Sequence, residues 1–179
     1  MTIDPEGAPP FPETDRLTLR RLGPEDAPAL QRVFEAAGDY FLGVTGRPEP
    51  DPDAAERELR GSAATAGRGV ALASLRESGE PVCALGWWAG NPEPEVALLG
   101  MLLTVPERRR GGIAREALGA LEAWLAGRGV GRIRTGVSTR DRRADAVLPA
   151  LGFTRMSIAE HQALGLDHAS LALWEKRIG

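Results

Sequence analysis

The chain has 179 residues, of which 42% are hydrophobic and 26% charged, and its formal net charge is −3. This balance predicts one folded domain with a sizeable core and excludes a largely disordered chain. The negative charge and the low aromatic content argue against a nucleic-acid binder. The single cysteine, Cys83, excludes an internal disulfide, and with two histidines it cannot build a common zinc site.

The sequence shows no pattern of membrane targeting. Its longest apolar stretch, 96–105, is far shorter than the roughly 20 residues of a membrane-spanning helix. The opening MTIDPEGAPPFPETD is acidic and lacks the basic and apolar regions of a secretory signal. We therefore expect a cytoplasmic protein without membrane association. Residues 1–13 hold four prolines and are predicted to be a flexible lead, followed by a single domain over 14–179.

Hydrophobic periodicity predicts the elements in chain order. Three helices are predicted, because apolar residues at helical spacing follow the turns at 23–26, 106–112 and 138–141. The segment 38–69 is interrupted by prolines and is predicted to be a loop with one short helix at 53–60. The predicted strands are 16–20, 70–76, 82–89, 96–105, 132–137 and two within 153–178, the last at 171–177. This order predicts an α/β domain with a mixed, mostly antiparallel central sheet and helices on both faces.

The turn after the central strand carries the strongest chemical signal. It reads Arg109-Arg110-Gly111-Gly112-Ile113-Ala114 and opens a helix that runs to about residue 128. A helix start presents unpaired N–H groups and partial positive charge, glycine lets a phosphate approach closely, and arginine adds charge. An ordinary turn with surface arginines has the same appearance in isolation. A Walker loop is excluded because the only lysine is Lys176, near the end of the sequence.

This turn resembles a known motif. Arg109-x-x-Gly112-x-Ala114 is similar to the Gln/Arg-x-x-Gly-x-Gly/Ala motif of the GNAT superfamily, the acetyl-CoA-dependent N-acetyltransferases. Pro106 stands where that family usually has a proline after the central strand. Residues 14–27 resemble the opening of the branch that acetylates the N-termini of ribosomal proteins. The late segments Asp141-x-x-Ala144 and Leu151-Gly152-Phe153 also resemble the family, so the likeness extends from residue 14 to about 177.

The resemblance implies how the co-substrate acetyl-CoA binds. Its pyrophosphate would lie on the backbone amides of 110–114, and its pantetheine arm would pair with the central strand where this strand separates from 132–137. An N–H near Leu103 would stabilise the oxyanion, and an amine would attack the thioester directly, without a metal or a covalent intermediate. The cofactor contacts implied are Met101, Leu103, Thr104, Arg109, Arg110, Gly111, Gly112, Ile113, Ala114 and Asp141.

The resemblance leaves the proton donor open. The positions where relatives carry an acid near the thiolate fall on Leu148 and Ala144, and neither can donate a proton. Ser138, Thr139, Tyr40 or water remain as candidates. Because this acid is missing, a second interpretation of the function stays open: a non-catalytic CoA-binding or sensory module on the same fold.

The general base is also open. Glu95 begins the central strand, where some relatives keep a catalytic glutamate, but its spacing to Arg109 is one residue off the family pattern, which would turn it to the other face. The alternative is a solvated strand-end carboxylate. Neutralising a lysine-type amine at pH 7 costs about 4.6 kcal/mol, against about 1 kcal/mol for an α-amino group. A site without a strong base therefore favours an amine of low pKa.

The predicted reaction is acetyl transfer to a primary amine, on a protein N-terminus or a small molecule. Nucleic acid and membrane partners are not expected, and a homodimer is left open. Trp124 and Trp174 are predicted to lie in the core, and one of Trp87 and Trp88 to pack inward. Cys83 is predicted to be a small buried hydrophobic residue rather than a nucleophile.

Overall fold

The computed structural model describes residues 9–139, 141–165 and 170–179. The strands are β1 (Leu17–Arg21), β2 (Arg68–Leu75), β3 (Pro81–Ala89), β4 (Val96–Thr104), β5 (Arg132–Ser138), β6 (Thr154–Arg155) and β7 (Leu171–Arg177). The helices are α1 (Ala27–Ala36), α2 (Gly38–Thr45), α3 (Ala54–Ala63), α4 (Ile113–Ala126), α5 (Ala144–Ala150) and α6 (Ile158–Ala163), with 3-10 turns η1 (Pro24–Asp26) and η2 (Pro106–Arg108).

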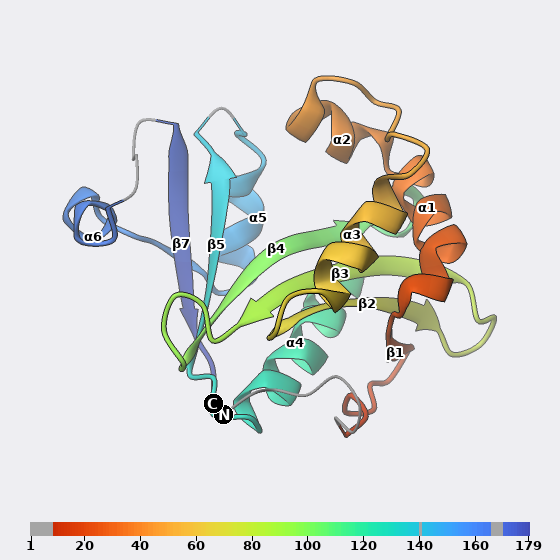
Figure 1. Cartoon of the computed structure of the whole chain (residues 1–179), viewed down its shortest axis with the longest axis horizontal. Coiled ribbons are helices and arrows are strands. Elements are labelled where there is room, and N and C mark those ends of the chain that lie inside the picture. The colour runs from red at the N-terminus through yellow and green to blue at the C-terminus, as the bar shows by residue number, and fades with distance from the viewer. Residues whose placement is uncertain (1–8, 140, 166–169) are drawn as a thin grey trace.

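The strands form one seven-stranded sheet in the order β1-β2-β3-β4-β5-β7-β6. Every neighbouring pair is antiparallel except β4 and β5, which run parallel. Helices α1 and α3 pack together over β2 and β3, whereas α4 covers the opposite face of the sheet (Figure 1). The predicted fold class is therefore confirmed. In the part of the chain described here, no helix is both long and apolar enough to cross a membrane.

The core lies on both faces of the sheet, under α4 on one face and under α1 and α3 on the other. The helical spacing of Ile113, Ala117 and Leu121 places these side chains on one face, and all three are buried. Trp124 and Trp174 are buried as predicted. Cys83 is fully buried, which raises the pKa of its thiol to about 11, and the predicted hydrophobic role is confirmed. Of the tryptophan pair in β3, Trp87 is buried and Trp88 exposed, which confirms the predicted division.

The end of the predicted lead packs on this core. Phe11 stacks on Trp124 with the ring centroids 5.1 Å apart, and its ring meets that of Trp87 edge-on at 5.9 Å. Trp124 Nε1 donates a hydrogen bond to the carbonyl oxygen of Pro9 at 2.9 Å. Pro9 and Phe11 thus contact the folded domain, and the division between a lead and the domain stays a prediction.

Two helices were absent from the sequence prediction. Helix α2 lies within the segment predicted to be a loop, and it is held by Phe41, which packs on Phe34 with the ring centroids 5.0 Å apart. Helix α6 lies between the last two strands and begins with a capping box formed by Ser157 and Glu160. His161, on α6, is buried, and its Nε2 accepts a hydrogen bond from the amide of Leu173 at 3.2 Å.

Candidate active site

A gap opens in the sheet between β4 and β5. The two strands pair only where 96–98 lies beside 132–134. The Thr135 hydroxyl donates to the carbonyl oxygen of Leu99 at 2.9 Å, and beyond this bond the described residues of the two strands do not pair. The cause lies in β4: the register with β3 shifts at this point and leaves Gly100 as an extra residue. Such a bulge bends a strand, so β4 turns away from β5 (Figure 1).

The strand register decides which backbone groups face the gap. The amide of Val105 donates to the carbonyl of Val82 in β3 at 3.0 Å. Because backbone groups alternate along an antiparallel strand, those of Leu103 also face β3, whereas those of Leu102 and Thr104 face the gap.

This finding corrects two of the expected cofactor contacts. Leu103 and Met101 are directed toward β3 through their backbones, and their side chains are buried. The expected oxyanion N–H near Leu103 would then belong to one of its neighbours, Leu102 or Thr104. Of the three contacts expected on β4, Thr104 alone keeps its backbone on the open edge.

The glycine turn after β4 has an unusual backbone. Arg110 has φ of 62° and Gly112 has φ of 80°, both in the left-handed region, and α4 begins immediately afterwards. A non-glycine residue held at positive φ is strained, and such strain collects at functional sites. Alternating backbone hands direct successive N–H groups into one concave anion-binding nest. Among the described residues, the amides of 110–114 donate no hydrogen bond.

These residues fit a diphosphate group. Gly111 and Gly112 are exposed, so no side chain of their own covers the loop amides. A Cβ atom added at Gly112 would lie 3.3 Å from Arg16 Nη2, which is tighter than an ordinary contact. The start of α4 adds the partial positive charge of a helix N-terminus. The expected anion site at Arg110 to Ala114 therefore keeps its physical basis.

Arg16 supports the loop 110–112 through hydrogen bonds, and the sequence alone did not predict this role. Its Nη1 donates to the carbonyl of Gly111 at 2.8 Å, and its Nε donates to Glu116 on the first turn of α4 at 2.7 Å. Its own amide donates to the other Glu116 oxygen at 2.7 Å. Arg16 thus ties the carbonyl of the loop to the first turn of α4 through Glu116, which restrains the loop backbone. No local motif marks this role, because Arg16 and Gly111 are far apart along the chain.

Replacing Arg16 with glutamine is expected to raise the KM for acetyl-CoA about fivefold to tenfold, while kcat stays within about twofold. The loss of one charge-assisted hydrogen bond, worth about 1.5 kcal/mol, loosens the loop before the ligand binds. Steady-state kinetics with varied acetyl-CoA measure both constants. Arg20→Gln is the matched control, since Arg20 pairs with Asp26 away from the loop. An equal change in both variants would contradict the expected role of Arg16.

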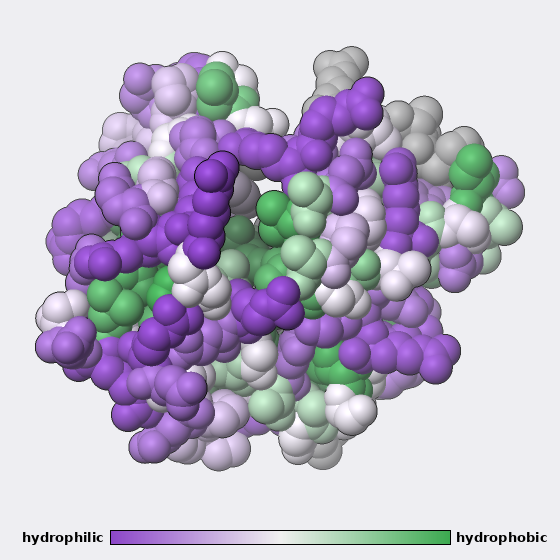
Figure 2. Space-filling view, turned by 180° about the vertical axis from the view of Figure 1, so that it is seen from behind, coloured by the Kyte–Doolittle hydropathy of each residue, from purple (hydrophilic) through white to green (hydrophobic). Residues whose placement is uncertain are grey.

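Asp39 bridges the two sides of the gap. It lies on the first turn of α2, and its carboxylate accepts hydrogen bonds from Arg109 at 2.5 and 2.8 Å. Arg143, just before α5, donates to the same carboxylate at 3.0 Å. Figure 2 shows a hollow with a hydrophobic floor between the α2 and α5 sides of the molecule, crossed at its rim by hydrophilic side chains. Hydrogen bonds from Arg109 lower the pKa of Asp39 to about 2.

The Asp39 carboxyl is expected to titrate with a midpoint near 2 rather than near its ordinary value of 3.8. Its ion pairs are therefore complete above pH 3.8 and are lost as the pH falls through about 2. Carbon-detected NMR of the side-chain carboxyl measures this midpoint. In the Arg109→Gln variant the midpoint should move back toward 3.8, and an unchanged midpoint would show that Arg109 is not the cause.

The catalytic candidates do not all gather in the gap. Glu95 lies at its closed end, where the carboxylate accepts a hydrogen bond from Arg132 at 3.0 Å. A hydrogen bond from its own amide and then the pair with Arg132 lower the pKa of Glu95, which makes it a weaker base. The structure therefore does not bring Glu95 together with the loop at the other end of β4, and we do not assign it as the base.

The remaining candidates lie nearer the open end. Tyr40 is half-buried beside Asp39 on α2, and burial raises the pKa of its hydroxyl. Ser138 is the last residue of β5, and Thr139 follows it. The carboxylate of Asp141 accepts the amide N–H of Arg143 at 3.0 Å and so supports the turn into α5.

Helix α5 presents no proton donor at the positions that the family alignment selects. Ala144 and Leu148 are both buried and pack on the apolar core. Gly152 follows the helix with φ of 91°, which confirms the predicted glycine C-cap.

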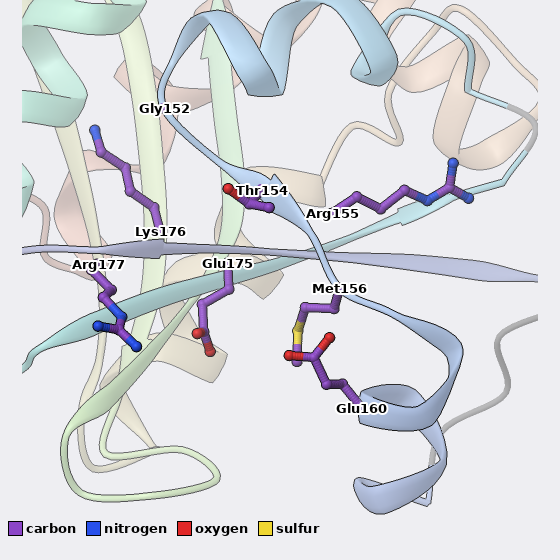
Figure 3. Close-up of a pocket in the computed structure, with 8 residues that line it drawn as sticks. All are labelled: Gly152, Thr154, Arg155, Met156, Glu160, Glu175, Lys176 and Arg177. Carbon is purple, nitrogen blue, oxygen red and sulfur yellow. The ribbon is translucent and has the colours of Figure 1, made fainter.

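A second pocket, open to solvent and about 440 Å³ in volume, lies on the far edge of the sheet. It is lined by Gly152, Thr154, Arg155, Met156, Glu160, Glu175, Lys176 and Arg177 (Figure 3). Two of its charges already have partners: Glu175 accepts from Arg134 at 2.7 Å, and Lys176 donates to Glu122 at 2.6 Å. Lys176 points to the opposite side of β7 from Glu175 and Arg177, as strand alternation requires. We find no reactive group in this pocket.

A sheet with a splayed parallel strand pair, ending in an amide-lined loop at a helix start, defines the class of CoA-dependent acyltransferases. Residues 16–154 match the family model described as an acetyltransferase (GNAT) domain. The chain therefore belongs to the GNAT acetyltransferase family. It is an acyl-CoA-dependent N-acyltransferase, with acetyl-CoA as its co-substrate.

Solved structures agree with this fold. An acetyltransferase from Thermus thermophilus superposes with a TM-score of 0.77 at 29% identity, covering 90% of this chain and 97% of that one. A ribosomal L7/L12 α-N-protein acetyltransferase, RimL, solved with coenzyme A, gives a TM-score of 0.70 at 17% identity, covering 94% and 97%. The PaiA N-acetyltransferase from Thermoplasma acidophilum, also with coenzyme A, gives 0.65 at 15% identity, covering 90% and 98%. A search of curated protein sequences finds no significant match.

Proposed function

We propose that this enzyme transfers the acetyl group of acetyl-CoA to a primary amine of low pKa, on a protein N-terminus or a small molecule. One observation carries the proposal: an anion-binding loop and an open strand edge lie at the same end of β4. The loop supplies the amides of 110–114, and the edge presents the backbone groups of Leu102 and Thr104. A CoA thioester needs both features, one for its diphosphate and one for its amide-bearing arm.

Different backbone groups of the chain bind different parts of acetyl-CoA. The loop amides hold the diphosphate, and the edge of β4 orients the arm as an added strand would be oriented. Bound acetyl-CoA supplies a thioester carbonyl that an amine can attack. The N–H of Leu102 or Thr104 faces the gap and is the candidate donor to the carbonyl oxygen, where negative charge develops in the transition state.

The acceptor follows from the finding that, among the residues that the structure describes, none offers a strong base in the gap. Glu95 is held at the closed end by Arg132, and Tyr40 keeps its proton at neutral pH because burial raises its pKa. The amine must therefore arrive neutral or lose its proton to water. At pH 7 the neutral fraction of an α-amino group is about 340 times that of a lysine side chain, from pKa values of about 7.8 and 10.4. This ratio favours an α-amine.

Thiol release from acetyl-CoA, measured at pH 7 with matched acceptors, tests the proposal. The acceptors are a lysine-free peptide with a free N-terminus, an N-blocked peptide with one lysine, and a polyamine. We expect the free N-terminus to be acetylated at least about tenfold faster than the lysine. Equal turnover would overturn the preference for a low-pKa amine.

The same experiment distinguishes acetyl transfer from a second candidate function, that of a non-catalytic CoA-binding module. The observation that favours this module is that Ala144 and Leu148, at the two positions where relatives carry the acid, are buried apolar residues that cannot donate a proton. Tight binding of coenzyme A with no turnover of any acceptor would support the module and overturn acetyl transfer.

A further inference from the structure

Three charged side chains from separate elements meet at the mouth of the gap. Arg109 follows η2, Arg143 precedes α5, and Asp39 lies on α2. Both guanidinium groups donate to the same carboxylate oxygen of Asp39, at 2.5 and 3.0 Å. Arg109 also donates from Nε to the carbonyl of Thr104 at 2.9 Å, which fixes its position at the end of β4. Two arginines converging on one oxygen anion form a site suited to phosphate.

This site lies beside the loop amides that fit a diphosphate, since Arg109 directly precedes Arg110. The three side chains are also accessible: the exposed fractions are 36% for Arg109, 39% for Asp39 and 58% for Arg143. Exposed ion pairs contribute little to stability, so a ligand phosphate with two negative charges can replace a single carboxylate. The carboxylate therefore lies where a phosphate of the co-substrate would be bound most strongly.

Apart from this bridge, helix α2 is attached to the core through two neighbouring aromatic side chains, Phe41 and the half-buried Tyr40. Among its described side chains Phe41 alone is buried, where it packs on Phe34. Gly38 begins the helix close to the carbonyl oxygen of Pro48, and Gly46, with φ of 77°, ends it, so the C-terminal end can change direction at small steric cost. Loss of the bridge would free α2 to pivot about Phe41.

We propose that Arg109 and Arg143 form a phosphate site for the co-substrate, that Asp39 occupies this site in the free enzyme, and that the phosphate displaces Asp39 and releases α2. The inference rests on the proposed use of acetyl-CoA. It adds that the Asp39 carboxylate competes with a phosphate of acetyl-CoA for the two arginines. Binding of the co-substrate then opens the α2 side of the gap.

Calorimetric titration of coenzyme A into the Asp39→Asn variant tests the competition. We expect binding about threefold to tenfold tighter than in the wild type, because the asparagine amide no longer competes as an anion. Asp26→Asn is the matched control, since Asp26 forms a similar two-bond pair with Arg20 outside the gap and should leave binding unchanged. In the double variant Asp39→Asn with Arg143→Gln, the gain in affinity should be lost.

Hydrogen exchange supplies an independent readout. On addition of coenzyme A to the wild type, the amides of α2 should exchange faster while those of 110–114 become protected. Dephospho-CoA distinguishes the source of the phosphate: a gain in affinity that persists with this ligand assigns the diphosphate, and a gain that disappears assigns the 3′-phosphate.

Two results overturn the inference. Unchanged or weaker binding by Asp39→Asn would show that Asp39 organises the arginines instead of competing with the ligand. If neither the wild type nor the variant binds coenzyme A, the proposed function fails together with the inference. If the wild type and Asp39→Asn bind coenzyme A with equal affinity, the inference fails but the proposed function stands.

Discussion

Replacing Gly112 with valine is expected to weaken coenzyme A binding about a hundredfold. Gly112 has φ of 80°, a region in which a β-branched residue is strained, and a Cβ atom there approaches Arg16. The loop must change its backbone to relieve this strain, and its amides then turn away from the diphosphate. The loss of two charge-assisted hydrogen bonds, each worth about 1.5 kcal/mol, corresponds to this factor. Isothermal titration measures the affinity directly.

Gly119→Ala is the control for this variant. Gly119 lies on the same helix, and nothing lies within 4 Å of a Cβ atom added there. The substitution should leave binding unchanged and raise the free energy of unfolding by about 0.5–1 kcal/mol, since alanine is the better helix former. Binding by Gly112→Val within about threefold of the wild type would show that the turn is an ordinary connection.

Replacing Leu121 with alanine is expected to lower the free energy of unfolding by about 2–5 kcal/mol. Leu121 has an exposed fraction of 0% and lies in the middle of α4, so its truncation leaves a cavity between the helix and the sheet. For a domain of this size the loss lowers Tm by about 4–20 °C. Urea unfolding followed by circular dichroism measures the free energy.

Leu42→Ala removes the same atoms from a side chain with an exposed fraction of 52% and serves as the reference. Its unfolding free energy should change by less than about 0.5 kcal/mol. Similar losses in the two variants would contradict the description of α4 as the helix that closes the core.

The sequence predicted the elements whose pattern repeats locally. The apolar face of α4 is visible at Ile113, Ala117 and Leu121, because burial on one side of a helix imposes its own spacing. The glycine turn was visible for a similar reason, since only small residues suit the left-handed position at Gly112. Both the apolar face of α4 and the glycine turn can be recognised from residues that are close together in the sequence.

The remaining features depend on contacts between distant residues. Helix α2 is short and bounded by glycines, so its local propensity is low and its packing through Phe41 decides its structure. The bulge at Gly100 follows from the register with β3 and not from the sequence of β4 alone. Likewise, Asp39 and Arg143 meet across the gap, and no local pattern relates them.

The single lysine has a consequence for an enzyme that handles activated thioesters. Lys176 is the only ε-amine in a sequence with 22 basic side chains, and its ammonium group is held by Glu122 at 2.6 Å. Guanidinium groups keep their charge and are not acylated under the conditions that modify lysine. The protein therefore keeps its basic side chains charged while it exposes a single ε-amine to acetyl-CoA, so its use of arginine limits acylation of its own side chains by the co-substrate.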